Sequence, residues 1–117
     1  MLILIADDDA ATRELLRAVL ESRGHTVLEA ETACHAIELI TNGKPDLAIV
    51  DGHMPVLLAE PVVAWGRILL NVAGLSRVRA ILFTGDRELA AEVQGEGGVV
   101  LVKGCHLEEI LKAVEGT

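Results

Sequence analysis

Aromatic side chains are nearly absent from this sequence of 117 residues, which holds one Trp, one Phe and no Tyr. Proteins that bind single-stranded nucleic acids stack bases on several such rings, so this composition excludes a stacking platform. Basic residues are also few, because 10 Lys and Arg stand against 18 Asp and Glu, for a formal net charge of −8. Nucleic-acid phosphates and anionic lipids attract the opposite charge. We therefore expect no direct nucleic-acid partner and no membrane surface.

Cysteines and long apolar runs are scarce as well. Two cysteines are too few for a small fold stapled by disulfides. No apolar run approaches the roughly 18 residues of a membrane-spanning helix. The opening Met1–Ala6 lacks the basic segment of a secretory signal and runs directly into three aspartates. These absences predict a cytoplasmic protein.

Apolar residues make up 51% of the chain, enough for a real core and against disorder, and the length predicts a single domain over residues 1–117. Five short apolar runs are typical of strands: Leu2–Ala6, Thr26–Ala30, Leu47–Val50, Ala80–Thr84 and Val99–Val102. The second run mixes in polar residues, which places it nearer an edge of the sheet.

Helical patterns fill the gaps between these runs. We expect five helices. The first follows Asp9, the second begins at a Thr32 cap, and the third runs from near Glu60 to about Asn71. The fourth spans Asp86–Gln94, and the fifth carries an apolar stripe from Leu107 to Val114. Alternating strands and helices predict an α/β fold, with a parallel sheet and helices on both faces.

Polar side chains stand at the ends of four of the five predicted strands. Asp7, Asp8 and Asp9 follow the first strand, Asp51 the third, and Thr84 and Lys103 end the last two. The carboxyl ends of parallel strands share one edge of a sheet, which is where such folds bind ligands. Clustered carboxylates repel one another, and Mg²⁺ relieves this while bridging to a phosphoryl group. A lysine and a threonine suit phosphoryl oxygens.

Blander explanations exist for each residue alone. An acidic run often caps a helix, which suits Asp9 better than Asp7 or Asp8, and Asp51 is also compatible with a turn. Taken alone, a threonine or a lysine at a strand end, such as Thr84 or Lys103, does not indicate a site. The complete set at one edge of a sheet is what indicates a site.

These motifs resemble the receiver domain of two-component response regulators over essentially the whole chain. Ile3–Asp9 followed by Arg13 resembles the family's first strand and acidic pair, and Asp46–Pro55 its phosphoacceptor strand with the D-x-x-M-P ending. Ala80–Gly85 resembles the strand that carries the switch threonine, and Val99–Lys103 the strand that delivers the lysine.

The resemblance implies a CheY-like, flavodoxin-like fold with strand order 2-1-3-4-5. It implies that Asp51 accepts a phosphoryl group from a sensor histidine kinase or a phosphotransfer protein, with Thr84 and Lys103 binding the new phosphoryl oxygens. Mg²⁺ would be held by Asp8, Asp51 and the backbone carbonyl of His53, with Asp7 acting on the metal through a bound water. The output would be a conformational shift read by a downstream protein. The strand order also separates Cys34 from Cys105, so we expect two free thiols.

The sequence departs from the family pattern at three places. Val100 stands where the family usually has an aromatic ring that moves with the threonine, and Gly104 stands where it prefers proline. The loop after D-x-x-M-P lacks the usual glycine pair and contains Val56–Ala59. Val56, Leu57 and Leu58 are compatible with a small exposed contact patch, but we expect them to pack against the following helix.

The spacing from Thr84 to Lys103 is also a few residues short of the family's, which we assign to the fourth helix or its glycine-rich exit. Because that helix belongs to the family's common output face, we expect an unusual partner surface.

His53, two residues after Asp51, stands where the family has a side chain that helps set how long the phosphoryl group survives. Asp86, two residues after Thr84, is its counterpart on the other side of the site and is equally compatible with a cap of the following helix.

Two other functions fit part of the pattern. A pseudo-receiver would keep the fold as an interaction module without phosphate, although degenerate receivers usually lose an acidic residue or the lysine. A haloacid-dehalogenase-type phosphatase also has D-x-D after a strand, as in Asp7-Asp8-Asp9, with a threonine and a lysine. That assignment lacks a later acidic pair, has no room for a cap domain and leaves Asp51 and Met54-Pro55 unexplained. The sequence therefore favours a regulatory phosphoacceptor over an enzyme.

Overall fold

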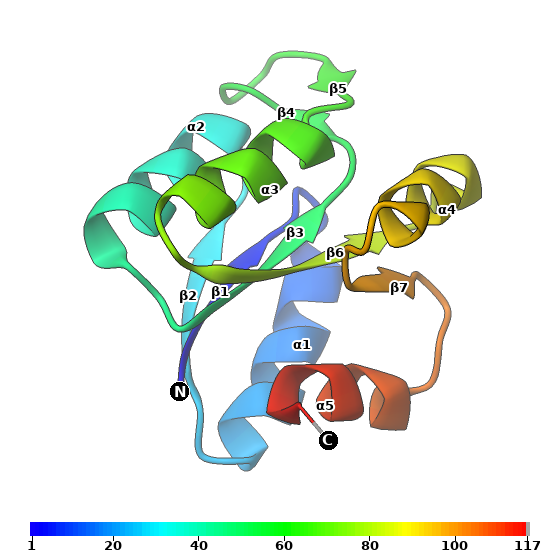
Figure 1. Ribbon diagram of the computed structural model, residues 1–117. Coiled ribbons are helices and arrows are strands. Elements are labelled where there is room, and N and C mark those ends of the chain that lie inside the picture. Colours follow the sequence, from blue (N-terminus) through cyan, green and yellow to red (C-terminus); the bar gives the residue numbers. More distant parts are fainter. Residues whose placement is uncertain (117) are drawn as a thin grey trace.

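A five-stranded parallel sheet lies between two layers of helices in the computed structural model, which describes residues 1–116 (Figure 1). Its strands are β1 (Leu2–Ala6), β2 (Thr26–Ala30), β3 (Leu47–Asp51), β6 (Arg79–Thr84) and β7 (Val100–Val102). They are ordered β2-β1-β3-β6-β7. Because β4 and β5 lie outside this sheet, the order is 2-1-3-4-5 in chain sequence, which confirms the predicted fold class.

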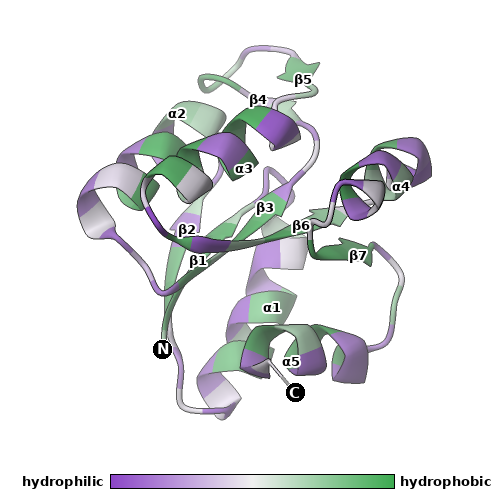
Figure 2. Cartoon of the chain, in the orientation of Figure 1, coloured by the Kyte–Doolittle hydropathy of each residue, from purple (hydrophilic) through white to green (hydrophobic). Residues whose placement is uncertain are grey.

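Burial of the strands follows their composition. Strand β3 is buried along its whole length, and so is β1 after its first residue, because both are covered by helices on two faces. At the edge, β2 exposes Thr26 and only partly buries Glu29. In Figure 2 most of the sheet is coloured hydrophobic, whereas α4 and α5 carry both colours.

Helices cover both faces of the sheet. α1 (Ala10–Ser22) and α5 (Leu107–Glu115) pack on one face, and α2 (Ala33–Glu38), α3 (Gly66–Leu75) and α4 (Arg87–Gly95) on the other. The expected caps are present: Asp9, Thr32 and Asp86 each accept a hydrogen bond from a backbone amide in the first turn of α1, α2 and α4. None of the helices within residues 1–116 combines the length and apolar character needed to cross a lipid bilayer.

The expected start of the third helix is wrong. Helix α3 begins at Gly66 rather than near Glu60, and it continues to Leu75. The residues before it form β5 (Val62–Val63), which pairs antiparallel with β4 (Met54–Pro55). Two consecutive β-branched residues favour extended backbone, and the pairing satisfies backbone groups that a helix would otherwise use. The second helix also changes form, since α2 passes into the π-helical η1 (Leu39–Gly43).

The segment after β4 does not pack against α3 as expected. Leu57 and Leu58 are 52% and 67% exposed. The amide of Cys34 donates a hydrogen bond of 3.0 Å to the carbonyl of Val56, so the segment lies beside α2 instead. Because β4 pairs with β5, these leucines lie in the loop that connects the two strands and not in a segment that leads directly into α3. Cys34 and Cys105 are both free thiols, as predicted.

We expect Gly66→Ala to lower the free energy of unfolding by about 1–3 kcal/mol. A Cβ at Gly66 would lie 2.7 Å from Cα of Gly52, a backbone atom that cannot rotate aside. The matched control is Gly74→Ala in the same helix, where a Cβ meets nothing within 4 Å. That variant should gain about 0.5–1 kcal/mol, because alanine favours helix. Urea unfolding measures both, and equal effects of the two substitutions would contradict the close approach.

Candidate functional site

Three carboxylates converge at the carboxyl edge of the sheet. Asp7 and Asp8 follow β1, and Asp51 is the last residue of β3, the strand beside it. One carboxylate oxygen from each of the three lies within 4.8 Å of the others. Asp7 and Asp51 are only 1% and 6% exposed, whereas Asp8 is open to solvent. The structure thus brings together the acidic residues that the sequence places at strand ends.

Lys103 supplies the positive charge of this site. Its Nζ lies 3.0 Å from Oδ2 of Asp7 and 3.1 Å from Oδ2 of Asp51. Only the contact with Asp51 has hydrogen-bond geometry, so the contact with Asp7 is one of charge. The backbone places the lysine here, because its amide donates a 2.8 Å hydrogen bond to the carbonyl of Thr84 at the end of the neighbouring strand.

Burial and the neighbouring charges shift the pKa values of Asp51 and Lys103. Burial and the nearby charge of Asp7 raise the pKa of Asp51 to about 6, although Lys103 and the amide of His53 oppose the rise. Burial alone would lower the pKa of Lys103, but Asp7 and Asp51 outweigh it and raise that pKa above its usual value. The lysine therefore remains charged while Asp51 releases its proton near pH 6.

Thr84 lies beside the backbone that follows Asp51. Its side chain is buried, and Oγ1 accepts a 3.0 Å hydrogen bond from the amide of Asp86. A Cβ at Gly52 would lie 2.8 Å from this oxygen, so the glycine leaves room for the hydroxyl. The predicted threonine is therefore at the site, and its hydroxyl is bound to the loop that starts α4.

His53 and Asp86 meet across the site. Nε2 of His53 lies 2.8 Å from Oδ2 of Asp86, which joins the loops after β3 and β6. The hydrogen bond that Asp86 accepts from the amide of Leu89 lowers the pKa of Asp86, and the contact with His53 lowers it further. The amide of His53 also donates a 3.3 Å hydrogen bond to Oδ1 of Asp51. Sequence reasoning placed the two side chains on either side of the site but did not predict their contact.

The acidic cluster suits a hard divalent cation. Oδ2 of Asp7 is buried and accepts no hydrogen bond, so its one strong contact is the 3.0 Å ion pair with Lys103, a charge that a bound cation could replace. Three carboxylates offer oxygen donors of the kind that Mg²⁺ prefers. The predicted Mg²⁺ ligand set, made of Asp7, Asp8, Asp51 and the carbonyl of His53, stays a prediction.

One contributor was missed as a site residue. The guanidinium of Arg13 donates a 2.7 Å hydrogen bond to the backbone carbonyl of Asp7. The sequence pattern identified Arg13 only as part of the family resemblance and not as a residue of the site. Its offset from the acidic run holds no signal for this contact, which depends on how α1 turns back over β1.

Comparison with known proteins gives a consistent result. A family model described as the response regulator receiver domain matches residues 3–115. The response regulator MprA of Mycobacterium sp. (strain KMS) is 44% identical over 55 residues, 47% of this chain and 24% of MprA. The sensor histidine kinase AruS of Pseudomonas aeruginosa is 32% identical over 120 residues, 96% of this chain and 11% of AruS. The chain thus spans about a quarter of MprA and about a tenth of AruS.

A solved structure agrees with the fold. The crystal structure of a CheY-like response regulator receiver domain protein from Methanospirillum hungatei JF-1 is 27% identical, with a TM-score of 0.81, and the match covers 98% of this chain and 90% of that one. A TM-score of this size over nearly the whole of both chains shows that the two share one fold. With the family model matching almost all of the sequence, this chain belongs to the response regulator receiver domain family.

Proposed function

We propose that this domain is a phosphorylation-dependent signalling switch in which Asp51 accepts the phosphoryl group. The observation that carries the proposal is the position of Asp51, which is buried beside a second carboxylate and bound by the Lys103 ammonium. The partner on the donor side would be a sensor histidine kinase or a phosphotransfer protein, and the exchange would take place in the cytoplasm. The role is regulatory rather than enzymatic.

The chemistry requires an ionised oxygen on Asp51. That oxygen attacks the phosphorus of a phosphohistidine, the P–N bond breaks, and its electron pair stays on the imidazole nitrogen, which then takes up a proton. Lys103 already lies against Asp51 and would bind one new phosphoryl oxygen. Asp7, Asp8, Asp51 and the carbonyl of His53 would hold Mg²⁺, which when bound neutralises charge on the phosphoryl oxygens.

A route from the site to the output surface begins at Thr84. Its hydroxyl accepts a hydrogen bond from the amide of Asp86, the residue that caps α4. A phosphoryl group carries about −1.5 to −2 charges and attracts the hydroxyl, which would release that amide and alter the start of α4. Val100 stands where the family usually has the moving aromatic ring, and it packs against the core on the α4 side. The proposed readout through Thr84 and Asp86 involves no aromatic ring. The reader would be a downstream protein.

The test is intact mass after incubation with Mg²⁺ and a small phosphodonor. We expect one added phosphoryl group on the wild type and none on Asp51→Asn. Asp46→Asn is the matched control: Asp46 lies just before β3, at the opposite end from Asp51, and its Oδ2 accepts a hydrogen bond from Leu2. It should be labelled like the wild type.

Two results would contradict the proposal. Label on Asp51→Asn would assign the phosphoacceptor to another residue. No label on a wild type that binds Mg²⁺ would favour the pseudo-receiver, an interaction module that keeps the fold without using phosphate.

A further inference from the structure

Arg13 reaches from the start of α1 back to the acidic loop. Its Nη1 donates a 2.7 Å hydrogen bond to the carbonyl oxygen of Asp7, and its Nε donates a 3.0 Å hydrogen bond to Oε1 of Glu29 on β2. The Arg13 side chain is only 14% exposed, so both contacts are shielded from water. Hydrogen bonds from a charged donor are among the stronger ones in proteins.

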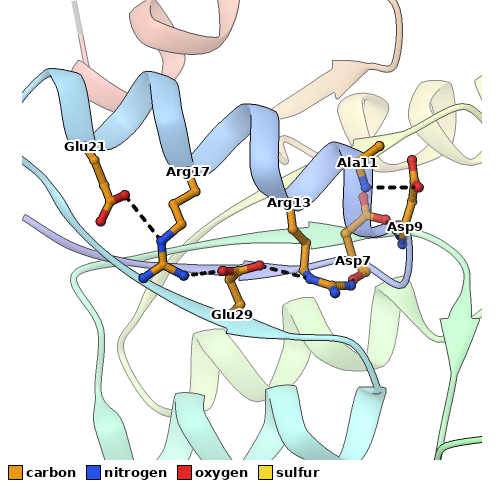
Figure 3. Close-up of polar contacts among 7 residues, drawn as sticks. All are labelled: Asp7, Asp9, Ala11, Arg13, Arg17, Glu21 and Glu29. Carbon is orange, nitrogen blue, oxygen red and sulfur yellow. Dashed lines mark hydrogen bonds and ion pairs between the residues drawn. The ribbon is translucent and has the colours of Figure 1, made fainter.

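The Arg13 guanidinium is the first member of a row of ion pairs that continues through Glu29, Arg17 and Glu21 (Figure 3). Glu29 is shared with Arg17, which binds its other carboxylate oxygen. Arg17 in turn contacts Glu21 at 3.3 Å. Residues 13, 17 and 21 are four apart and therefore lie on one face of α1, above β2. The position of Arg13 is thus determined by two secondary-structure elements rather than by one flexible side chain.

The carbonyl that Arg13 binds belongs to the peptide joining Asp7 to Asp8. The rest of this loop is held at its flanks, because the amide of Asp7 donates to Ala30 (3.0 Å) and the amide of Asp9 donates to Oδ1 of Asp7 (2.9 Å). Among these three contacts, the one with Arg13 is made to the peptide that separates the two acidic side chains. Rotation of that peptide would turn the carboxylates of Asp7 and Asp8 relative to Asp51.

We propose that Arg13 is a positioning residue for the acidic cluster. By fixing the peptide between Asp7 and Asp8, it holds both carboxylates toward Asp51 and thereby raises the affinity of the cluster for a divalent cation. This inference rests on the proposed function, because it assumes that the cluster binds Mg²⁺. The competing explanation is structural, in which Arg13 only ties α1 to β2 through Glu29.

Magnesium affinity separates the two explanations. Residues that orient metal ligands typically contribute about tenfold or more to affinity, so Arg13→Ala should weaken Mg²⁺ binding by about tenfold in a calorimetric titration. Arg17→Ala is the matched control, since it breaks the same ion-pair chain on the same helix face without touching Asp7. It should bind Mg²⁺ within about twofold of the wild type, because an exposed ion pair contributes little.

Arg13→Lys serves as a second variant if Arg13→Ala does not fold. A lysine keeps the charge but has a single nitrogen in place of the two that contact Glu29 and the Asp7 carbonyl, so its Mg²⁺ affinity should also fall. Wild-type affinity in either Arg13 variant would overturn the proposal, and so would an equal loss in Arg17→Ala.

A readout without metal tests the positioning itself. In metal-free protein, the carbonyl ¹³C signal of Asp7 should shift and the amide of Asp9 should exchange faster in the Arg13 variants, but not in Arg17→Ala. Unchanged signals would overturn the positioning role. A wild type that binds no Mg²⁺ would instead overturn the metal part of the proposed function, and with it the proposed effect on affinity.

Discussion

Lys103→Ala is expected to lower the free energy of unfolding of the metal-free protein by about 3 kcal/mol at pH 7.5. The ammonium lies 3.0 Å from Asp7 and 3.1 Å from Asp51, two carboxylates that are almost completely buried. Removing it leaves two negative charges facing each other without a cation. Breaking one side of a buried ion pair is costly for this reason, whereas exposed pairs contribute little.

The loss should be reversible by other cations. Millimolar Mg²⁺ should restore much of the stability of Lys103→Ala, because the metal replaces the missing charge. Acidification to pH 5 should do so as well, since Asp51 then binds a proton. Lys112→Ala, an exposed lysine on α5, is the control and should change stability by less than about 0.5 kcal/mol. Urea unfolding of both variants decides the matter, and a Lys103→Ala protein as stable as the wild type would contradict the electrostatic role of the lysine.

Asp51→Asn should have the opposite effect on the metal-free protein, a gain of about 2–3 kcal/mol at pH 7.5. The pKa of Asp51 is raised in the folded state from 3.8 to about 6, chiefly by burial and then by Asp7. Between those two values the folded state binds more protons than the unfolded one, so the wild type loses stability as pH rises through this window. Above it, the penalty of the buried charge is fully present, and asparagine removes that charge with little change in shape.

The measurement is urea unfolding of both proteins in a chelator from pH 4 to pH 8. The difference in stability should be small at about pH 4 and grow until about pH 6.5. Adding Mg²⁺ at pH 7.5 should stabilise the wild type more than Asp51→Asn, because the variant has lost a charged ligand. A difference that does not change with pH would contradict the raised pKa of Asp51.

Local patterns made most of the fold predictable. Runs such as Leu2–Ala6 and Leu47–Val50 are apolar because a strand covered on both faces has no polar side. Such strands can therefore be recognised in the sequence alone. Helix caps at Asp9, Thr32 and Asp86 are equally local, since each side chain binds an amide two or three residues away. The start of α3 was not predictable in the same way, because β5 forms only by pairing with β4, a segment earlier in the chain.

What the sequence by itself determined is the set of chemical groups at the carboxyl ends of the strands: Asp7, Asp8, Asp51, Thr84 and Lys103. Strand ends follow from composition, and parallel strands bring their ends to one edge whatever the details of packing. Only the tertiary structure decided how these groups are held. The bridge from His53 to Asp86 and the hydrogen bond from Arg13 to the Asp7 carbonyl depend on how loops and helices meet over the sheet. Such contacts leave no periodic trace in the sequence, because they join residues through space.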